Sequence, residues 1–572
     1  MRYVLPLLIF AVLACQPPKP EAKQADSPAL PFRPHILWLV AEDLSPIIPP
    51  FGDSTVQTPN LSRLAAEGVR YPNLFSVSGV CAPSRAGIAT GMYPISIGAH
   101  NMRTQYSKAY FEQLGLGVDA YDAVPPPAVR MMSQILREQG YYATNNDKTD
   151  YQMRPSPMAW DESGQHAHWR DRASGQNFFS IFNFGITHES QVFGPSGKKN
   201  LRYRAGFPDR SRNPGWGEKI DSSEWKLHVP ADLEVPVPPY LVDNEPTRND
   251  VRRAYSNIVQ MDQQVGYILD QLEQDGLLDS TIIVWYTDHG GPLPRQKRLM
   301  YDSGLRVPMI IRFPGAYRAG EMDSTLVSFI DLAPTMFSLA GIQPPDYLQG
   351  QAFLGEYQAA QPRQFIHGAA DRLDTEYDRI RAVRDNRYKY LRNFNPERGY
   401  YLEVKYREQM VAMQELLKGR EAGTLTPEQA QWFRESKPEE EVFDTQADPH
   451  ELRNLADDPA YAAKLAKLRA ECERWLNAVG DKGEIPEPDL IRQMWGGTTA
   501  PLTTAPAVTL DNNKLSLSNR TEGASMGYQI GAQTGRWTPY TGPVEVDPAQ
   551  SIRVIAHRLG YTPSEVVHLG GR

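Results

Sequence analysis

Two pairs of residues that can bind cations or exchange protons follow apolar runs of the sequence. Glu42-Asp43 comes just after the apolar run 36–40, and Asp288-His289 comes directly after the run 281–287. Runs of this kind are typical of parallel strands that are buried on both faces. Open α/β sheets place their ligands at the carboxyl ends of such strands, so we expect both pairs at one edge of one sheet.

A cysteine in an unusual setting is the other candidate for chemistry. Residues 81–85 read Cys-Ala-Pro-Ser-Arg, and the small residues after Arg85 suit the start of a tightly packed helix. Cys81 would then lie at the amino end of the helix, where backbone N–H groups and the helix dipole favour anions. The alternative is a buried structural cysteine, the usual fate of a lone cysteine in a long chain.

The sequence around Cys81 resembles the signature of the sulfatase family, in which a Cys in a C-x-P-S-R context is oxidised to formylglycine, the catalytic aldehyde. The resemblance runs from residue 34 to about 480 and implies an alkaline phosphatase-like fold. The motifs at 144–148, 187–190 and 297–298 look closest to the heparan N-sulfatase-like branch of bacterial polysaccharide sulfatases. A formylglycine-generating maturation enzyme is an implied partner.

The resemblance also implies roles for charged side chains around the formylglycine. Arg85, Lys148 and Lys297 would neutralise charge that develops on the sulfate. His188, just beyond a predicted buried strand, is the candidate general acid, and His100 is the candidate second helper histidine. Both histidines, Lys148 and Lys297 would bind the substrate. For Lys148 and His188 the alternatives are a surface lysine and a loop histidine.

A divalent cation is the cofactor that the resemblance implies. Its ligands would be Glu42, Asp43, Asp288, His289 and the residue derived from Cys81. The family usually has Asp at the position of Glu42. Oxygen ligands favour Ca²⁺, the family's usual ion, whereas the nitrogen of His289 also admits Mg²⁺ or Mn²⁺.

The predicted function is hydrolysis of sulfate esters in a sulfated polysaccharide or its oligosaccharides. We expect exo-type action, with O-sulfate favoured over N-sulfate. One alternative is a phosphonate or phosphate ester hydrolase of the same superfamily, which would use the same groups. The other is a non-catalytic glycan-binding surface lipoprotein, which the retained carboxylates, lysines and histidine disfavour.

Composition excludes other classes of function. The 572 residues are 41% hydrophobic and 22% charged, as in a globular protein with large cores. The net charge of -8 gives no basic footprint for nucleic acid and no polybasic patch for a membrane. Only three cysteines occur, at 15, 81 and 472, so no disulfide framework is expected.

The amino end of the chain predicts export. Residues 1–15 carry one early positive charge and an apolar run too short to span a bilayer. Residues 12–15, Val-Leu-Ala-Cys, resemble a bacterial lipobox, which makes 1–15 a lipoprotein signal peptide, Cys15 the lipidated residue and 16–33 a flexible tether. A plain secretory signal is the alternative. We expect a periplasmic or cell-surface protein that contacts a bacterial membrane only through its lipid anchor.

The expected fold class is α/β, with a mixed sheet sandwiched by helices. The predicted units are a catalytic domain over 34–365, an α+β C-terminal subdomain over 366–485, a linker over 486–510 and a small β-sandwich over 511–572. The sandwich resembles one appended to some β-hexosaminidases, because residues 514–517 and 552–557 alternate like half-buried strands.

Within these units, a stretch over 194–249 is rich in Pro, Arg and Trp and shows little periodicity. It predicts a long insertion that faces the substrate, with aromatic and arginine contacts from 194–225. The following spacing predicts a helix over 251–272, paired strands over 380–393 and a helix over 459–479 with Cys472 in the core.

Overall fold

A mixed eight-stranded sheet forms the centre of the structure, a computed structural model that describes residues 33–193, 227–531 and 535–570. The strand order is β4-β3-β5-β1-β6-β7-β2-β8. Strands β3, β5, β1 and β6 are parallel neighbours, whereas β7 is antiparallel to β6 and β2. The strands span His35–Ala41 (β1), Val69–Phe75 (β2), Tyr142–Asn146 (β3), Glu162–Ser163 (β4), Phe178–Phe184 (β5), Thr281–Thr287 (β6), Arg306–Arg312 (β7) and Val327–Ser328 (β8).

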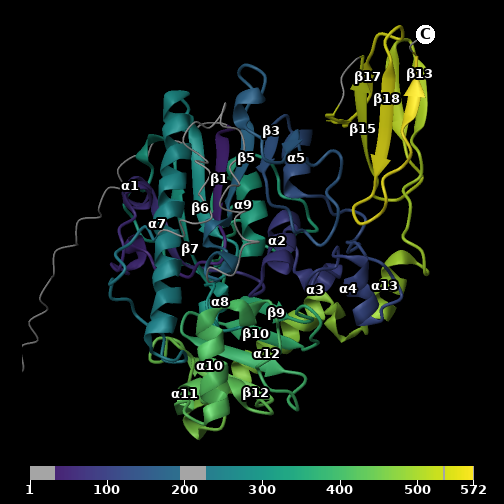
Figure 1. Ribbon diagram of the computed structural model, residues 1–572. Coiled ribbons are helices and arrows are strands. Elements are labelled where there is room, and N and C mark those ends of the chain that lie inside the picture. Colours follow the sequence, from purple (N-terminus) through teal and green to yellow (C-terminus); the bar gives the residue numbers. More distant parts are fainter. Residues whose placement is uncertain (1–32, 194–226, 532–534, 571–572) are drawn as a thin grey trace, which may run out of the picture.

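Helices cover both faces of this sheet (Figure 1). Side chains of β1 alternate between the faces: Leu37 and Leu39 pack in a core with α1 and α7, whereas Ile36 and Trp38 pack in another with α2, α5 and α9. All four are fully buried, as predicted for a strand inside an α/β sheet. The helices span Pro59–Glu67 (α1), Cys81–Thr90 (α2), Met132–Glu138 (α5), Glu245–Gln274 (α7) and Leu332–Leu339 (α9).

Helix α7 begins earlier than its apolar spacing predicts. The side chain of Asn244 accepts a hydrogen bond from the Thr247 amide (3.1 Å), which caps the helix and starts it at Glu245. The end of the expected insertion over 194–249 is therefore helical. The part for which we predict sugar contacts, 194–225, lies outside the described residues.

Four antiparallel strands in the order β12-β11-β10-β9 form a smaller unit, which Figure 1 shows below the central sheet. The predicted pairing within 380–393 is confirmed, because β10 and β11 are antiparallel neighbours. Cys472 on α12 is buried against this sheet with Val383 and Leu468, as predicted. The elements span Ile366–Ala370 (β9), Ile380–Arg384 (β10), Tyr388–Asn393 (β11), Val411–Ala422 (α10), Glu440–Asp444 (β12) and Ala462–Val479 (α12).

Two small antiparallel sheets, β13-β14-β17 and β16-β15-β18-β19, form the C-terminal unit. Leu515, Ile552 and Val554 lie in the core between them, so the predicted alternation is confirmed for β14 and the start of β18. It is wrong for the rest of β18, where residues 554–557 are buried on both faces. The strands span Ala507–Asp511 (β13), Lys514–Ser518 (β14), Ser525–Ile530 (β15), Thr538–Pro539 (β16), Val544–Glu545 (β17), Ile552–His557 (β18) and Val567–Leu569 (β19).

This C-terminal unit stands to one side of the molecule in Figure 1, yet it is docked on the unit of the central sheet. Arg137 donates a hydrogen bond to the Trp537 carbonyl (2.9 Å), and Arg558 donates one to the Pro125 carbonyl (2.7 Å). Both arginines are buried. Since burying a guanidinium is costly without such acceptors, these contacts fix the orientation of the unit.

The structure differs from the expected linker over 486–510. Glu487–Trp495 forms a helix, α13, in which Leu490 and Ile491 are buried. The Glu487 carboxylate receives two hydrogen bonds from the Arg372 guanidinium, at 2.7 and 2.8 Å, and both side chains are inaccessible to solvent. The segment after residue 486, where the composition changes, therefore begins with a short packed helix. The buried ion pair between Glu487 and Arg372 holds this helix in place.

Glu487→Gln should lower the free energy of unfolding by roughly 3 kcal/mol, because it leaves the buried Arg372 guanidinium without a counter-charge. Chemical denaturation followed by fluorescence would measure the loss. Glu484→Gln is the matched control, because that side chain is 68% exposed and lies 3.8 Å from Arg379. Equal stability of the two variants would contradict the prediction.

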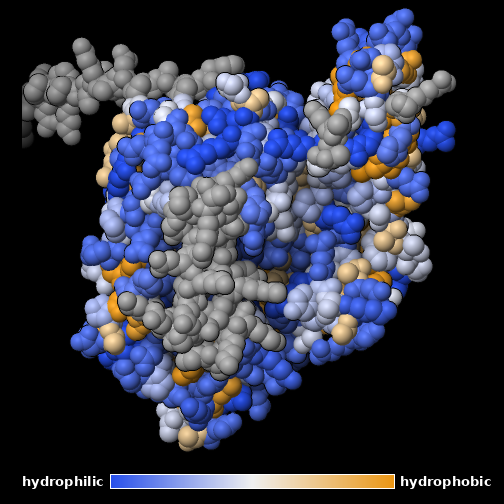
Figure 2. Space-filling view, turned by 45° about the horizontal axis from the view of Figure 1, so that its top comes forward, coloured by the Kyte–Doolittle hydropathy of each residue, from blue (hydrophilic) through white to orange (hydrophobic). Residues whose placement is uncertain are grey.

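Among the described helices, none combines the length and the apolar character that a membrane span requires. Figure 2 shows one face of the molecule, where hydrophobic residues lie in small groups among hydrophilic ones. Scattered exposed apolar side chains of this kind are normal for a protein surface.

Candidate active site

Four neighbouring parallel strands deliver the predicted site residues to one edge of the sheet. The pair Glu42-Asp43 follows β1 and the pair Asp288-His289 follows β6. His188 comes shortly after β5, and Lys148 shortly after β3. Because these strands are parallel and adjacent, their carboxyl ends meet, as the sequence predicts. Cys81 joins them as the first residue of α2.

Asp43, Cys81, Asp288 and His289 form a buried cluster at this edge. The Nε2 atom of His289 lies 3.0 Å from Asp43 Oδ1, 3.7 Å from Asp288 Oδ1 and 3.2 Å from Cys81 Sγ. Potential ligand atoms of the four side chains lie within 4.8 Å of one another, and Glu42 belongs to an overlapping group. The cluster therefore has the donor set and spacing of a metal site.

The orientation of His289 also fits a metal ligand. Its Nδ1 lies 3.0 Å from the Gly290 carbonyl, so Nδ1–H donates there and Nε2 faces the cluster. Burial lowers the pKa of His289, but Asp288 and Asp43 outweigh burial and raise it to about 10. The same negative potential would attract a divalent cation, which would replace the proton on Nε2.

Two lysines contact the outer oxygens of the carboxylates. Lys148 Nζ lies 2.6 Å from Glu42 Oε2, and Lys297 Nζ lies 2.5 Å from Asp43 Oδ2. Burial raises the pKa of the Cys81 thiol, but Lys297 and Lys148 lower it to about 6. Both lysines line the same cavity as Cys81, so their ammonium groups can bind an anion there.

Arg85 lies behind the cluster. Its Nε donates to Asp288 Oδ2 (2.9 Å) and its Nη1 donates to Asn183 Oδ1 (2.7 Å). The side chain is buried and is not among the described residues that line the cavity, and its Nη2 has no hydrogen-bond partner among the described residues. This geometry gives Arg85 a positioning role through Asp288, and the charge neutralisation expected from the sequence stays a prediction.

His188 is oriented by its own loop. Its Nδ1 accepts a hydrogen bond from the Ser190 amide (3.2 Å) and lies 2.9 Å from the Ser190 hydroxyl. Because Nδ1 accepts, the neutral ring carries its proton on Nε2. The ring lines the same cavity as Cys81, so it can present this proton to a bound ligand.

His100 does not join the other predicted residues. Its side chain is buried, Asp371 and Arg381 are among the charges that act on it, and burial lowers its pKa. The next part of its loop pairs with another segment, where the Met102 amide donates to the Arg372 carbonyl (2.9 Å). This contact holds the loop against the smaller unit, so His100 faces that unit's charges and is not among the described residues that line the cavity with Cys81.

A cavity of about 490 Å³ opens over the cluster. Its walls come from the strand-end loops, from the loop after α3 (Pro94–Ile97) and from the smaller unit. The described residues that line it include Cys81, Arg103, Lys148, His188, Lys297 and Tyr406.

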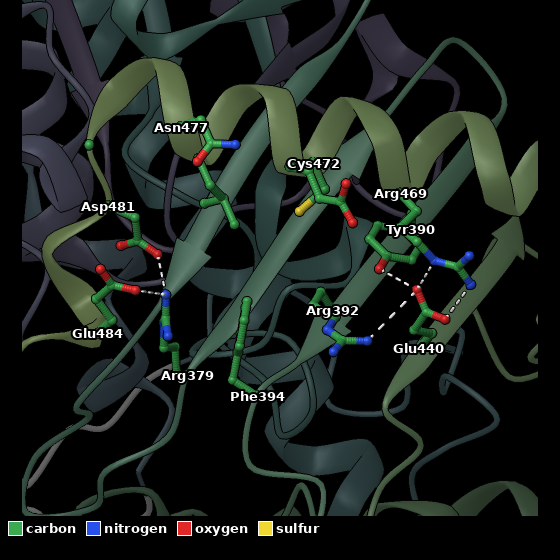
Figure 3. Close-up of a pocket in the computed structure, with 13 residues that line it drawn as sticks. Arg379, Tyr390, Arg392, Phe394, Glu440, Arg469, Cys472, Asn477, Asp481 and Glu484 are labelled. Carbon is green, nitrogen blue, oxygen red and sulfur yellow. Dashed lines mark hydrogen bonds and ion pairs between the residues drawn. The ribbon is translucent and has the colours of Figure 1, made fainter.

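A larger cavity of about 680 Å³ lies elsewhere, between α12 and the strands beside it (Figure 3). Its arginines are paired with carboxylates: Arg379 lies 2.8 Å from Asp481, and Arg469 lies 2.6 Å from Glu440. Burial raises the pKa of Cys472, which also lines it, to about 12. A neutralised cavity with an unreactive thiol is a poor candidate for chemistry, so we place the site at Cys81.

Sequence reasoning missed a buried ion pair next to two predicted residues. Arg298 donates two hydrogen bonds to the Glu189 carboxylate, at 2.8 and 2.7 Å, and Lys297 lies 3.3 Å from the same group. Burial raises the pKa of Glu189, but Arg298 and Lys297 lower it to about 2. The sequence offered one indication of this pair: Glu189 directly follows His188, and Arg298 directly follows Lys297.

Several residues in and beside the cluster have a strained backbone conformation. Asp43, Arg103, Asp150 and Arg298 all have positive φ, at 47°, 61°, 52° and 76°. Non-glycine residues rarely adopt this conformation, and it persists where the surroundings enforce it, often at functional sites.

Residues 34–342 match the family model described as Sulfatase. The chain belongs to the sulfatase family. Residues 295–416 also match a model described as N-sulphoglucosamine sulphohydrolase, C-terminal, which agrees with the predicted branch. An ulvan-active sulfatase of Formosa agariphila is 51% identical over 563 residues, which cover 96% of this chain and 94% of that protein. This sulfatase is therefore a sulfuric ester hydrolase, as predicted.

More distant relatives agree. The N-sulphoglucosamine sulphohydrolase of Homo sapiens is 24% identical, over 77% of this chain and 89% of that protein. A solved structure in complex with its substrate D-glucosamine-2-N,6-O-disulfate has a TM-score of 0.55 and 19% identity, over 79% of this chain and 100% of that one. A 2-O GAG sulfatase has a TM-score of 0.53 and 18% identity, over 78% and 93%. These likenesses confirm the predicted alkaline phosphatase-like fold.

Proposed function

We propose that this sulfatase removes sulfate from a sulfated polysaccharide or its oligosaccharides, by means of a formylglycine derived from Cys81 and a divalent cation. The observation that carries the proposal is the convergence of Cys81, Lys148, His188 and Lys297 on one cavity beside a carboxylate cluster. The substrate class is supported by the 51% identical relative, which is described as active on ulvan.

The side chains of the cluster and the cavity fit both the formylglycine and the divalent cation. Glu42, Asp43, Asp288 and His289 would hold the cation, with Ca²⁺ first and Mg²⁺ or Mn²⁺ next, since three of the four ligands are carboxylates. The hydrated aldehyde and the cation together supply a nucleophile strong enough to attack sulfur.

The chain's own side chains then bind and orient the ester. Lys148 and Lys297 would hold sulfate oxygens, because their ammonium groups line the cavity beside Cys81. His188 would donate the proton on Nε2 to the leaving sugar oxygen. Arg85 would keep the Asp288 carboxylate in place from behind.

The residues that line the cavity also indicate how a polysaccharide substrate would bind. The loop after α3 and Tyr406 of the smaller unit line the cavity with Cys81, so we infer that one terminal sugar enters, as in exo-type action on an O-sulfated sugar. Sulfate release from ulvan oligosaccharides of defined structure by the purified protein tests the proposal. Parallel assays on an aryl sulfate and an aryl phosphonate compare the two leaving oxyanions. Preference for the phosphonate, or equal release from internal and terminal sugars, would contradict it.

We also propose that the protein is exported and anchored by a lipid on Cys15, which lies outside the described residues. The support is the lipobox-like sequence at 12–15. Cys15→Ala should move the protein from the membrane fraction to the soluble fraction, because one peptide segment without its acyl chains binds a bilayer weakly. Fractionation with an immunoblot measures this, and a wild-type protein found wholly in the soluble fraction would refute the anchor.

A further inference from the structure

Arg103 lies in the cavity that contains Cys81 but takes no part in the cluster described above. We propose that Arg103 determines specificity by binding a second anionic group of the substrate, on the reacting sugar or its neighbour, while the lysines hold the sulfate that is cleaved. This inference rests on the proposed function and names a further feature of its substrate. Carboxylate and sulfate share the chemistry that would be recognised, so the experiment separates them.

The position of Arg103 suits contact with a ligand. It follows α3 on a loop that the Met102 amide ties to the Arg372 carbonyl (2.9 Å). Its own φ of 61° is unfavourable for a non-glycine residue, so the fold holds it in an orientation that costs energy. The side chain remains 20% exposed, whereas that of Lys297 in the same cavity is 3% exposed.

Aromatic rings hold the guanidinium in place. Its central carbon lies 4.7 Å from the centroid of the Tyr106 ring and 5.7 Å from that of the Tyr406 ring. Both tyrosines line the cavity as well. A guanidinium that is already stacked loses little conformational entropy when it binds a ligand. Its remaining N–H donors can therefore form favourable hydrogen bonds to that ligand.

Those donors are the two terminal amino groups. Asp374 forms an ion pair at the Nε edge of Arg103. Among the described residues, none accepts a hydrogen bond from the terminal amino groups of Arg103. Arg298 differs, because the Glu189 carboxylate takes both of its terminal groups and its side chain is 4% exposed. Of these two arginines, Arg103 is the one that can offer a bidentate edge to an oxyanion.

The Asp374 carboxylate faces a second guanidinium besides that of Arg103. Arg298 Nε lies 4.0 Å from the other oxygen of Asp374, so one carboxylate faces two guanidinium groups. Because Glu189 pairs with Arg298, this corner is already neutral, and an anion would bind Arg103 through hydrogen bonds to its terminal amino groups. A substrate without the second anion would lack these hydrogen bonds.

The test compares wild-type protein with Arg103→Gln and Arg103→Lys on matched substrates. They are 4-nitrophenyl sulfate, a sulfated disaccharide with a neighbouring uronic acid, the same disaccharide after reduction of its carboxyl group, and D-glucosamine-2-N,6-O-disulfate beside D-glucosamine-6-O-sulfate. Arg492→Gln is the matched control, since that side chain is 55% exposed on α13. Melting temperatures establish that each variant is folded.

We expect Arg103→Gln to lower kcat/KM about 10- to 100-fold on a substrate with the second anion and at most about threefold on its partner without it. The kcat/KM of Arg103→Lys should lie between those of wild-type protein and Arg103→Gln, because a lysine keeps the positive charge but cannot form two parallel hydrogen bonds to one oxyanion. A loss confined to the uronic acid pair identifies a carboxylate, and one confined to the glucosamine pair identifies a second sulfate. Equal loss on every substrate, or none, would overturn the inference. If wild-type protein cleaves none of these sulfates, the proposed function itself fails.

Discussion

Cys81→Ala should abolish turnover, with less than about 1% of wild-type activity left. Covalent catalysis by the group at this position contributes far more than the roughly 100-fold of a single positioning side chain, and alanine can form neither the thiolate nor the aldehyde. The fold should survive, because the variant removes only one buried sulfur atom at the start of α2. Steady-state sulfate release measures the loss.

Cys472→Ala is the matched control, since Cys472 is a buried cysteine packed in the core of the smaller unit. It should keep its activity while losing some stability. Mass spectrometry of the peptide that contains Cys81 should detect the aldehyde in wild-type protein from a host that has the maturation enzyme. More than about 1% of activity in Cys81→Ala would refute the covalent role of this residue.

Removal of the metal should reduce kcat by roughly 1000-fold, since a bound cation contributes several kcal/mol of charge stabilisation. Dialysis against a chelator, followed by addition of Ca²⁺, Mg²⁺ or Mn²⁺ one at a time, would measure the loss and rank the ions. Asp43→Asn should have a comparable effect, because Asp43 contacts His289 and Lys297 at the centre of the cluster.

Metal content measured by elemental mass spectrometry gives a readout that is independent of activity. Asp43→Asn should hold less metal than wild-type protein, while Asp346→Asn, at an exposed position, should hold the same amount. Full activity in chelator-treated protein that is free of metal would exclude the predicted role of the cluster.

The sequence predicts the central sheet and most of the cluster, because both depend on short-range patterns. Apolar runs predict buried strands, and parallel strands bring their carboxyl ends together, so Asp43 and Asp288 meet although they are far apart in the chain. His188 follows by the same argument from β5, whereas Lys148 follows from the resemblance to the family.

Residues whose role depends on long-range packing could not be predicted. Arg85 stands one turn after Cys81 on α2, and only the tertiary structure shows that this turn places its guanidinium on Asp288. His100 belongs to a loop whose partner is a segment of the smaller unit, so its local motif was misleading. The helix over Glu487–Trp495 depends on an ion pair with Arg372, which no local pattern reveals.

The wall of the cavity is built from two parts of the chain, so substrate specificity and chemistry can change separately. The reacting groups stand on strand ends of the central sheet, whereas Tyr406 and Asp374 belong to the later part of the chain. Mutations near these two residues can reshape the sugar pocket while the chemistry on the strands stays under separate selection. Substitutions of these two residues can therefore alter which sulfated glycan is accepted while the residues at the strand ends stay the same.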